Sequence, residues 1–205
     1  MKPYYDDGRG IVIYHGDCRE IIQSFAGLYA VVTDPPYGMD YDTDGSRFTL
    51  GGRSLPRVYG DKAPFDPKPW MEYPSCVLWG FNHFPTNLPP GGSLVWIKRS
   101  DAAFGQFLSD CEVAWVKGIQ GVYAFRNIRH AIAERRVHPT EKPVDLMAWS
   151  ILQGTEDSDA ILDPFMGSGT TLRAAKDLGR KAIGIEIEEK YCEIAVRRLA
   201  QEVLL

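Results

Sequence analysis

A strand, turn, helix and strand pattern near the carboxyl end constrains the fold of this chain more than any other feature. A short apolar run, Ala160–Leu162, leads into a turn that contains Gly167 and Gly169. A helical pattern over Thr170–Leu178 follows, and a second apolar run, Lys181–Ile187, comes after it. Two strands joined through a helix pair in parallel, because a tight hairpin turn connects only antiparallel neighbours. The chain is therefore expected to be an α/β protein.

The same alternation of strands and helices continues along the rest of the chain. Strands are predicted at Val12–Tyr14, Ala30–Thr33, Ser93–Ile97, Ala114–Val116, Ala160–Leu162 and Lys181–Ile185. Helices are predicted at Cys18–Phe25, Pro69–Tyr73, Ala103–Ser109, Pro143–Leu152, Thr170–Leu178 and Glu188–Val203. This order predicts a doubly wound, Rossmann-like, mostly parallel sheet with helices on both faces. A length of 205 residues suits a single domain, 1–205.

A second motif closes the apolar run Ala30–Thr33 with the residues Asp34, Pro35, Pro36 and Tyr37. The Asp34 carboxylate and the Pro35 carbonyl can each accept one N–H of a planar amine, which would draw its nitrogen toward tetrahedral geometry. The Tyr37 ring can stack on a nucleobase that has been flipped out of a duplex. The alternative interpretation is a strand end with a rigid Pro-Pro turn, in which Asp34 is only a turn residue.

The glycine-bearing turn and the strand after it have the spacing of a nucleoside site. Gly167 and Gly169 allow the backbone to pass close to a ligand, and the N–H groups at the helix start can hold a carboxylate. Glu186 lies about 20 residues beyond the glycines, where a nucleoside-binding α/β unit places the carboxylate that accepts both ribose hydroxyls. The turn has neither a G-x-G-x-x-G pattern nor a Gly-Lys-Ser/Thr ending. A nucleoside joined to an amino acid therefore fits better than a dinucleotide or a nucleoside triphosphate.

With these two motifs the chain resembles the permuted, β-class S-adenosylmethionine-dependent DNA amino-methyltransferases, the N6-adenine/N4-cytosine family. Phe165–Thr170 matches the FxGxGT cofactor loop of that family, and Asp34–Tyr37 matches its (D/N/S)PP(Y/F/W) catalytic turn. The catalytic turn precedes the cofactor loop, as in the β-class. His138–Pro143 is similar to the family's HPT(Q/E)KP segment, and Val12–Cys18 is similar to the strand that carries an acid to the adenine of the cofactor.

The resemblance implies a circularly permuted methyltransferase fold that binds S-adenosyl-L-methionine and releases S-adenosyl-L-homocysteine. It implies that Asp34, Pro35, Pro36 and Tyr37 are catalytic. The cofactor-binding residues that it implies are Asp17, Thr140, Lys142, Asp163, Phe165, Gly167, Ser168, Gly169, Thr170 and Glu186. Asp17 is the candidate acceptor for the amino group of the cofactor's adenine. For Thr140 and Lys142, a helix start or a surface position is the alternative interpretation.

The first residue of the catalytic turn indicates the target. Within the family, Asp at this position is associated mainly with N6 of adenine, and Ser with N4 of cytosine. The resemblance therefore implies a site-specific or relaxed DNA methyltransferase that acts on a flipped-out adenine. Transfer to N4 of cytosine is the runner-up, because the two amines are geometrically alike. An inactive DNA-binding or cofactor-binding module is a further alternative. A restriction-modification partner, a solitary regulator and a phage enzyme are all compatible settings.

A formal charge of −4 means that a nucleic-acid enzyme must concentrate its cations. Two stretches outside the family match, residues 38–69 and 117–137, do so and are interpreted as inserted loops. The candidate DNA-contacting residues are Arg47, Arg53, Arg57, Lys117, Arg126, Arg129, Arg135 and Arg136. The expected partner is double-stranded DNA, bound by a monomer or a homodimer. A pair of solvated surface loops is the alternative interpretation.

Several other kinds of site are not expected. The four cysteines lie far apart with no Cys-x-x-Cys pair, so they are predicted to be buried thiols and not zinc ligands. Asp40–Gly45 is similar to the first half of a calcium loop, but Gly51 stands where the bidentate Glu belongs. No metal is expected there, and a lid over the base pocket is the suggested role. Without a long apolar run or a signal-peptide pattern, we expect a cytoplasmic, non-membrane protein of bacterial or phage origin.

Overall fold

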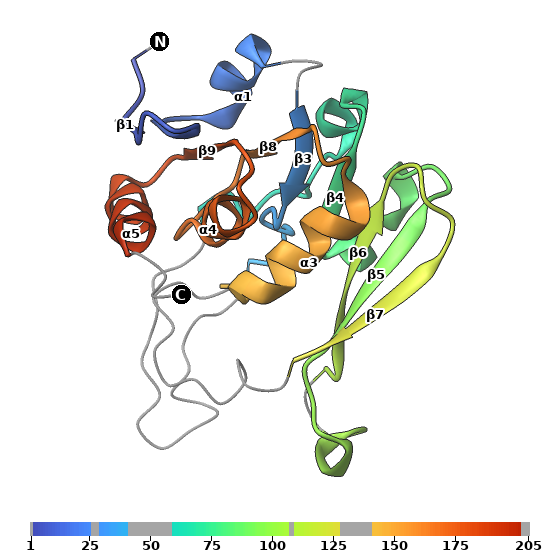
Figure 1. Cartoon of the computed structure of the whole chain (residues 1–205). Helices are drawn as coiled ribbons and strands as arrows, with labels where there is room; N and C mark the ends of the chain where they lie inside the picture. The colour runs from blue at the N-terminus through green and yellow to red at the C-terminus, as the bar shows by residue number, and fades with distance from the viewer. Residues whose placement is uncertain (1, 26–28, 41–58, 107–108, 128–140, 202–205) are drawn as a thin grey trace.

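A computed structural model describes residues 2–25, 29–40, 59–106, 109–127 and 141–201. These residues form a nine-stranded sheet in the order β1-β2-β9-β8-β3-β4-β6-β5-β7 (Figure 1). The strands are β1 Tyr5–Asp6, β2 Ile11–His15, β3 Tyr29–Thr33, β4 Cys76–Trp79, β5 Gly92–Ile97, β6 Cys111–Val116, β7 Val122–Arg126, β8 Ala160–Asp163 and β9 Ala182–Glu186. The pairs β1–β2, β4–β6 and β5–β6 are antiparallel, and the other pairs are parallel. The predicted mostly parallel α/β sheet is confirmed.

The two motifs follow strands that are neighbours in the middle of this sheet. β3 and β8 pair in parallel, with Val31 opposite Leu162. Their carboxyl ends therefore lie side by side, so the turns that begin at Asp34 and Pro164 start at the same edge of the sheet. Ligands of open α/β sheets bind at this edge. The prediction that both motifs lie at the carboxyl ends of adjacent strands is confirmed.

The side chains of the central strands alternate between two cores, one on each face of the sheet. On β3, Ala30 and Val32 pack into one core, and Val31 packs into the other. On β8, Ile161 and Leu162 divide in the same way. Consecutive central residues of each strand are therefore apolar, as expected for a sheet that is covered on both faces.

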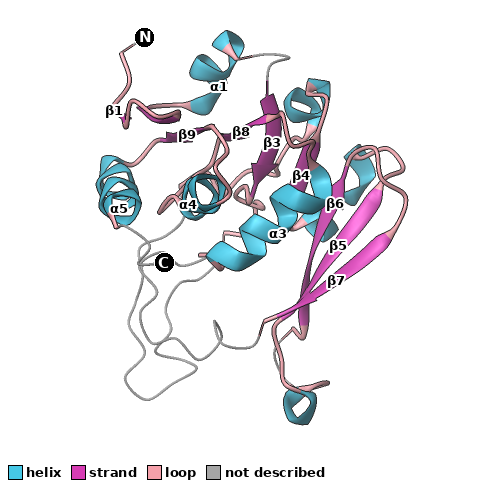
Figure 2. Cartoon of the chain, in the orientation of Figure 1, coloured by secondary structure: helices cyan, strands magenta, loops and turns pink. Residues whose placement is uncertain are grey.

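Helices cover both faces (Figure 2). The first core lies beneath the helices α3 Val144–Gly154, α4 Thr170–Asp177 and α5 Glu189–Ala200. The second core lies beneath α1 Cys18–Ile21 and the 3-10 helices Ile22–Ser24 and Lys68–Glu72. Short 3-10 helices at Phe81–His83, Pro85–Asn87 and Asp101–Ala103 complete the described elements. Positive φ angles at Gly169 and Gly179, 78° and 69°, mark the two ends of α4, which agrees with its prediction from the glycine pattern.

One predicted helix is wrong, and one strand was not predicted. The helix predicted at Ala103–Ser109 is absent from the described residues 103–106, where Gly105 adopts a left-handed φ of 74° that interrupts helical winding. Cys76–Trp79 was not predicted as a strand but forms β4. All four of its side chains are buried, so the strand lacks the alternation by which a half-exposed strand is recognised.

The interpretation of 117–137 as a loop also needs correction, because β7 lies inside it. β7 pairs with β5 alone, at the end of the strand order, and Val122 and Tyr123 are exposed. Four of its five residues are exposed and only Phe125 is partly buried, so this edge strand lacks the buried face by which a strand is recognised in the sequence.

Three of the cysteines, Cys18, Cys76 and Cys192, are buried free thiols, as predicted, and Cys111 is partly exposed. None of the helices in the described part of the chain combines the length and apolar character needed to cross a bilayer.

Candidate functional site

A buried hydrogen bond joins the two strands that carry the motifs. The Thr33 hydroxyl at the end of β3 donates to Asp163 Oδ1 at the end of β8 over 2.7 Å. The same carboxylate oxygen accepts the backbone N–H of Phe165, the first residue of the cofactor loop, over 3.1 Å. Burial raises the pKa of Asp163 to about 6. Asp163 thus ties the start of the cofactor loop to the strand of the catalytic turn.

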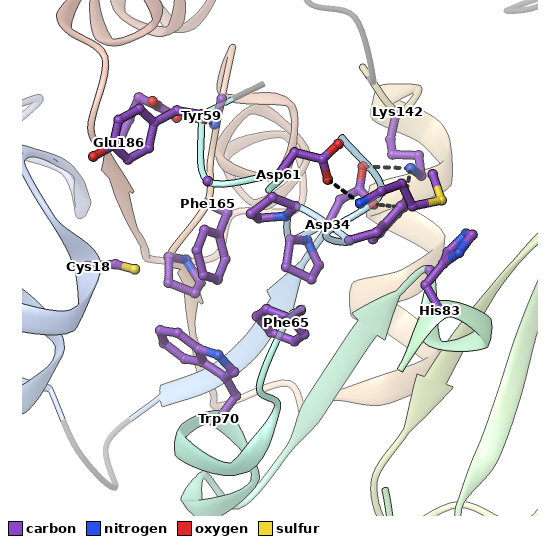
Figure 3. A pocket seen from close by; sticks show the side chains of 18 of the residues that line it. Cys18, Asp34, Tyr59, Asp61, Phe65, Trp70, His83, Lys142, Phe165 and Glu186 are labelled. Atoms are coloured by element: carbon purple, nitrogen blue, oxygen red, sulfur yellow. Dashed lines mark hydrogen bonds and ion pairs between the residues drawn. The ribbon is translucent and has the colours of Figure 1, made fainter. Parts of the chain in front are cut away.

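A cavity of about 1140 Å³ opens at this edge of the sheet. Asp17, Glu186, Asp34 and Tyr37 all line it, so both motifs face the same space, and Figure 3 shows Glu186 and Asp34 on opposite sides of it. The aromatic side chains between them are Phe65, Trp70 and Phe165 (Figure 3). Trp70 and Phe65 both meet the Phe165 ring edge-on, with centroids 5.3 and 5.8 Å away. Such a volume exceeds that of a typical single-ligand pocket, which is about 300 to 1000 Å³.

Glu186 ends β9, and its carboxylate is satisfied by backbone groups. It accepts the N–H of Gly167 over 2.9 Å and that of Glu188 over 2.8 Å. Burial raises the pKa of Glu186 to about 7, in spite of these two bonds. Gly167 has a φ of 50°, which favours glycine. The cofactor loop and the acid predicted to hold a ribose are therefore in direct contact.

Gly169 is required by packing as well as by its φ of 78°. A Cβ at this position would lie 2.6 Å from the Cβ of Ala195 on α5. The cofactor loop therefore approaches α5 more closely than a residue with a side chain would allow.

Asp17 lies next to Glu186 at the ends of two parallel strands. β2 and β9 pair with His15 opposite Glu186, and Asp17 follows β2 as the N-cap of α1. Its carboxylate accepts the backbone N–H of Arg19 over 2.9 Å and forms an ion pair with the Arg19 guanidinium. The bonds from Arg19 lower the pKa of Asp17, against the opposing effect of burial. An ionised acceptor therefore stands at this end of the cavity.

The hydroxyls of Ser168 and Thr170 are held by an arginine that the sequence analysis missed. Arg198 on α5 donates from Nη1 to Ser168 Oγ over 3.1 Å and to Thr170 Oγ1 over 2.6 Å. Its Nη2 forms an ion pair with Glu141. Arg198 lies about one turn beyond Ala195 on the packed face of α5. An arginine on the apolar face of a helix is the sequence feature that could have indicated this role.

The Asp34 carboxylate is held by two donors. The Tyr37 hydroxyl donates to Oδ1, and Lys142 Nζ donates to Oδ2 over 2.6 Å. Burial raises the pKa of Asp34, although the Lys142 ammonium acts in the opposite direction. Lys142, predicted as a cofactor ligand, lies just before α3 with 6% of its side chain exposed. The structure brings it to the catalytic turn.

Lys142 has a second partner that sequence reasoning also missed. Its Nζ lies 3.0 Å from Glu112 Oε2 on β6, and Glu112 Oε1 accepts a bond from Lys98 over 2.8 Å. Although burial acts in the opposite direction, the two ammonium groups lower the pKa of Glu112 to about 2. The sequence feature that could have indicated this role of Glu112 is a carboxylate inside an otherwise apolar strand.

The Tyr37 ring is fixed by the loop that follows β4. It stacks on the His83 ring, with centroids 4.8 Å apart and an interplanar angle of 15°. Gly80, with a φ of 76°, leaves room for the ring, because a Cβ there would lie 2.0 Å from it. Pro35 and Pro36 line the cavity beside Tyr37. All four residues of the catalytic turn are therefore placed at the cavity wall.

The predicted DNA-contacting residues are only partly described. The predicted site residues outside the described part of the chain are Arg47, Arg53, Arg57, Arg129, Arg135, Arg136 and Thr140. Arg126 is exposed on β7 and pairs with Asp101 over 2.8 Å. Lys117 Nζ donates to the carbonyl oxygens of Met71 and Tyr73 over 2.8 and 2.6 Å, so its ammonium holds the end of a 3-10 helix. Its contact with DNA stays a prediction.

The stretch 38–69 contributes a wall of the cavity where it is described. Asp61 is buried, and its Oδ1 accepts the backbone N–H of Gly38 over 2.8 Å, which returns the chain to the catalytic turn. The lid suggested for Asp40–Gly45 lies, apart from Asp40, outside the described residues.

Comparisons with known proteins agree with this site. A family model described as DNA methylase, for N6 and N4 methyltransferases, matches residues 98–197. The chain is 47% identical over 81 residues to the Type II methyltransferase M.BglII of Bacillus subtilis, a match that covers 40% of this chain and 22% of the relative. It is 54% identical over 65 residues to the Type II methyltransferase M2.DpnII of Streptococcus pneumoniae, which covers 32% and 24%. These matches span about a quarter of the length of the relatives.

Solved structures resemble nearly the whole chain. The M1.HpyAVI–SAM complex is 26% identical, with a TM-score of 0.58 over 92% of this chain and 100% of that one. The PvuII DNA methyltransferase, described as cytosine-N4-specific, matches at a TM-score of 0.61 over 96% of this chain and 88% of that one. Its identity is 16%, so it supports the fold alone. Together with the placement of both motifs at the ends of adjacent strands, these matches support an S-adenosylmethionine-dependent amino-methyltransferase of the N6/N4 family.

Proposed function

We propose that this protein transfers a methyl group from S-adenosyl-L-methionine to the exocyclic N6 of a flipped-out adenine in DNA. The observation that carries the proposal is the single cavity lined by Glu186 and Gly167 at one end and by Asp34 and Tyr37 at the other. Its volume of about 1140 Å³ suits a nucleoside with an amino acid and a nucleobase together. The similarity to Type II methyltransferases supports the same reaction class.

The donor set at the Glu186 end fits the cofactor. Two acids, Asp17 and Glu186, stand at the ends of neighbouring strands, and the glycine backbone at Gly167 leaves space beside them. We assign Glu186 to the ribose hydroxyls and Asp17 to the adenine amino group, because carboxylate oxygens accept such N–H and O–H bonds. Bound there, the cofactor supplies a methyl group on a positively charged sulfur.

The catalytic turn acts on the amine. The Asp34 carboxylate and the Pro35 carbonyl accept its N–H bonds, and the Tyr37 ring offers a surface for the base. Each carboxylate oxygen has two lone pairs, so Asp34 can accept from the amine while it keeps its bonds from Tyr37 and Lys142. When the nitrogen gains the methyl group it must lose a proton. Asp34 Oδ can take that proton, because burial raises its pKa.

Transfer to N4 of cytosine is the second candidate, because a pair of hydrogen-bond acceptors suits either planar amine. Asp34 favours adenine through its association within the family, and the neighbouring Tyr37 accepts either base as a stacking surface.

Analysis of the methylated nucleoside tests both candidates. Purified protein is incubated with labelled S-adenosylmethionine and unmethylated DNA of mixed sequence, and the DNA is digested to nucleosides. We expect label in N6-methyladenine. Label in 4-methylcytosine would establish the second candidate. Asp34→Ala serves as the control that removes the side-chain acceptor, and it should lose transfer while it still binds cofactor. No label in DNA, with cofactor binding intact, would indicate a cofactor-binding module.

A further inference from the structure

Four charges of alternating sign run along the wall of the cavity, starting at the catalytic turn. Asp34 Oδ2 lies 2.6 Å from Lys142 Nζ, Lys142 Nζ lies 3.0 Å from Glu112 Oε2, and Glu112 Oε1 lies 2.8 Å from Lys98 Nζ. The four come from the end of β3, the segment before α3, β6 and the end of β5. Figure 3 shows Lys142 reaching from its own segment toward Asp34.

The ion pair between Asp34 and Lys142 is largely buried, unlike an ion pair at the surface. The side chain of Lys142 is 6% exposed and that of Asp34 is 14% exposed. An ammonium removed from water is strongly unfavourable unless it is paired, and removal of one partner leaves the other charge buried and uncompensated. Lys142 has carboxylates on two sides and also lies 5.9 Å from the centre of the Tyr37 ring. Its ammonium is therefore held at the catalytic turn by charge on several sides.

Six titratable groups surround Asp34 or its direct partners in the described residues. They are Tyr37 on the same turn, His83 after β4, Lys98 after β5, Glu112 on β6, Lys142 before α3 and Asp163 at the end of β8. Of these, Lys142 is the cation in contact with the carboxylate, and Glu112 is the anion that shares it. Burial raises the pKa of Asp34, and among the neighbouring charges Lys142 lowers it while Glu112 raises it.

We propose that Lys142 and Glu112 are positioning residues that act through Asp34. Lys142 orients the carboxylate and favours its charged form, which can accept the amine. Glu112 pairs with Lys142 from the other side and offsets part of the effect of the ammonium charge on Asp34. Asp34 therefore stays able to take a proton after transfer. The catalytic consequence of this inference rests on the proposed function. The electrostatic coupling between Lys142, Glu112 and Asp34 is independent of that function.

The coupling predicts shifts of opposite sign in the two neutralising variants. Lys142→Met removes the cation that favours the carboxylate, so Asp34 should titrate at higher pH than in the wild type. Glu112→Gln removes a competing anion and leaves Lys142 to Asp34 alone, so Asp34 should titrate at lower pH. We expect each shift to be about one pH unit or more. The double variant removes both charges and should titrate between the two single variants.

Carbon-13 NMR of aspartate carboxyl groups measures this titration without any methyl transfer. Asp34→Asn identifies the resonance. Glu193→Gln is the matched control, because Glu193 is 53% exposed and pairs with Arg197 on the surface of α5, so its loss should leave the Asp34 titration unchanged. Thermal unfolding and S-adenosylmethionine affinity show that each variant is folded. If Lys142→Met alone does not fold, Glu112→Gln and the double variant still give the sign of the coupling.

Methyl transfer as a function of pH gives the catalytic consequence. The acid limb of kcat should move upward in Lys142→Met and downward in Glu112→Gln, with KM for DNA changed less than twofold. Shifts of the same sign, or no shift in either variant by NMR, would overturn the inference. If the NMR shifts occur and the wild type transfers no methyl group to DNA, the proposed function fails and the coupling stands.

Discussion

Thr33 and Asp163 are 130 positions apart in the sequence, and their side chains meet in the interior at 2.7 Å. Thr33 precedes the catalytic turn, and Asp163 precedes the cofactor loop. The bond therefore sets the distance between the part of the cavity assigned to the amine and the part assigned to the methyl donor. Positioning of this kind supplies a large share of the rate in a direct transfer between two bound groups.

Thr33→Val removes the hydroxyl and keeps the shape, so Asp163 loses a buried donor. We expect the free energy of unfolding to fall by about 1 to 3 kcal/mol, measured by urea denaturation. The pKa of Asp163, about 6, lies above its usual value, so the folded state keeps a proton that the unfolded chain loses. The stabilisation that comes from the raised pKa of Asp163 is therefore fully present below about pH 4, and it is lost as the pH rises through about 6. Loss of the bond should raise that pKa further. Thr33→Ser keeps the donor and should retain the wild-type pH profile.

Cofactor affinity should depend on the ionisation of Glu186. Its pKa is raised to about 7, so the carboxylate that would accept the ribose hydroxyls forms as the pH rises through neutrality. S-adenosylmethionine should therefore bind more tightly at pH 8 than at pH 6, by up to about tenfold for one full ionisation. Calorimetry at the two pH values measures this ratio. Glu186→Gln should bind more weakly and without the pH dependence, and a variant with the wild-type pH dependence would exclude Glu186 as its source.

Arg198 should matter to the cofactor loop although it lies on α5. Arg198→Met leaves the hydroxyls of Ser168 and Thr170 without their donor and leaves Glu141 without its ion pair. We expect cofactor affinity to fall about tenfold, or about 1.4 kcal/mol. Arg197→Met is the control, because the adjacent Arg197 is 78% exposed and makes a surface pair with Glu193. Equal effects of the two variants would show that the loss comes from α5 in general.

Arg126 tests whether β7 contributes to DNA binding. Its guanidinium is half exposed, and a surface pair such as that with Asp101 is worth about 0 to 1 kcal/mol, so it can be exchanged for a phosphate contact. Arg126→Ala should weaken DNA binding and lower the slope of log K against log salt by about one. Fluorescence anisotropy across a salt series gives the slope. Arg197→Ala should leave it unchanged, and an unchanged slope in Arg126→Ala would remove β7 from the DNA surface.

Much of the fold could be predicted because its signals are local. The strands and helices around both motifs follow from apolar runs and from glycines that need positive φ angles, as at Gly169 and Gly179. Where such signals are weak the prediction fails. Cys76–Trp79 is buried on both faces and shows no alternation, whereas Val122–Arg126 is an exposed edge strand inside a basic stretch.

The candidate site also has a part that could be predicted from the sequence and a part that could not. The chemistry of the catalytic turn and of the cofactor loop could be predicted, because carboxylate, prolines, aromatic ring and glycines act within a few consecutive residues. Connection rules for parallel strands also led to the correct placement of the two motifs on adjacent strands. The partners of these residues could not be predicted. Lys142 was expected at the cofactor and contacts Asp34.

The sequence by itself therefore determined which residues form the two turns, and it predicted a chemistry for each. Only the tertiary structure decided what holds them, namely Lys142 and Glu112 at Asp34, and Arg198 at the cofactor loop. The physical reason is that these are side-chain contacts between elements far apart in the chain. Their existence depends on strand order, register and helix packing, which local patterns of hydrophobicity and backbone preference do not specify.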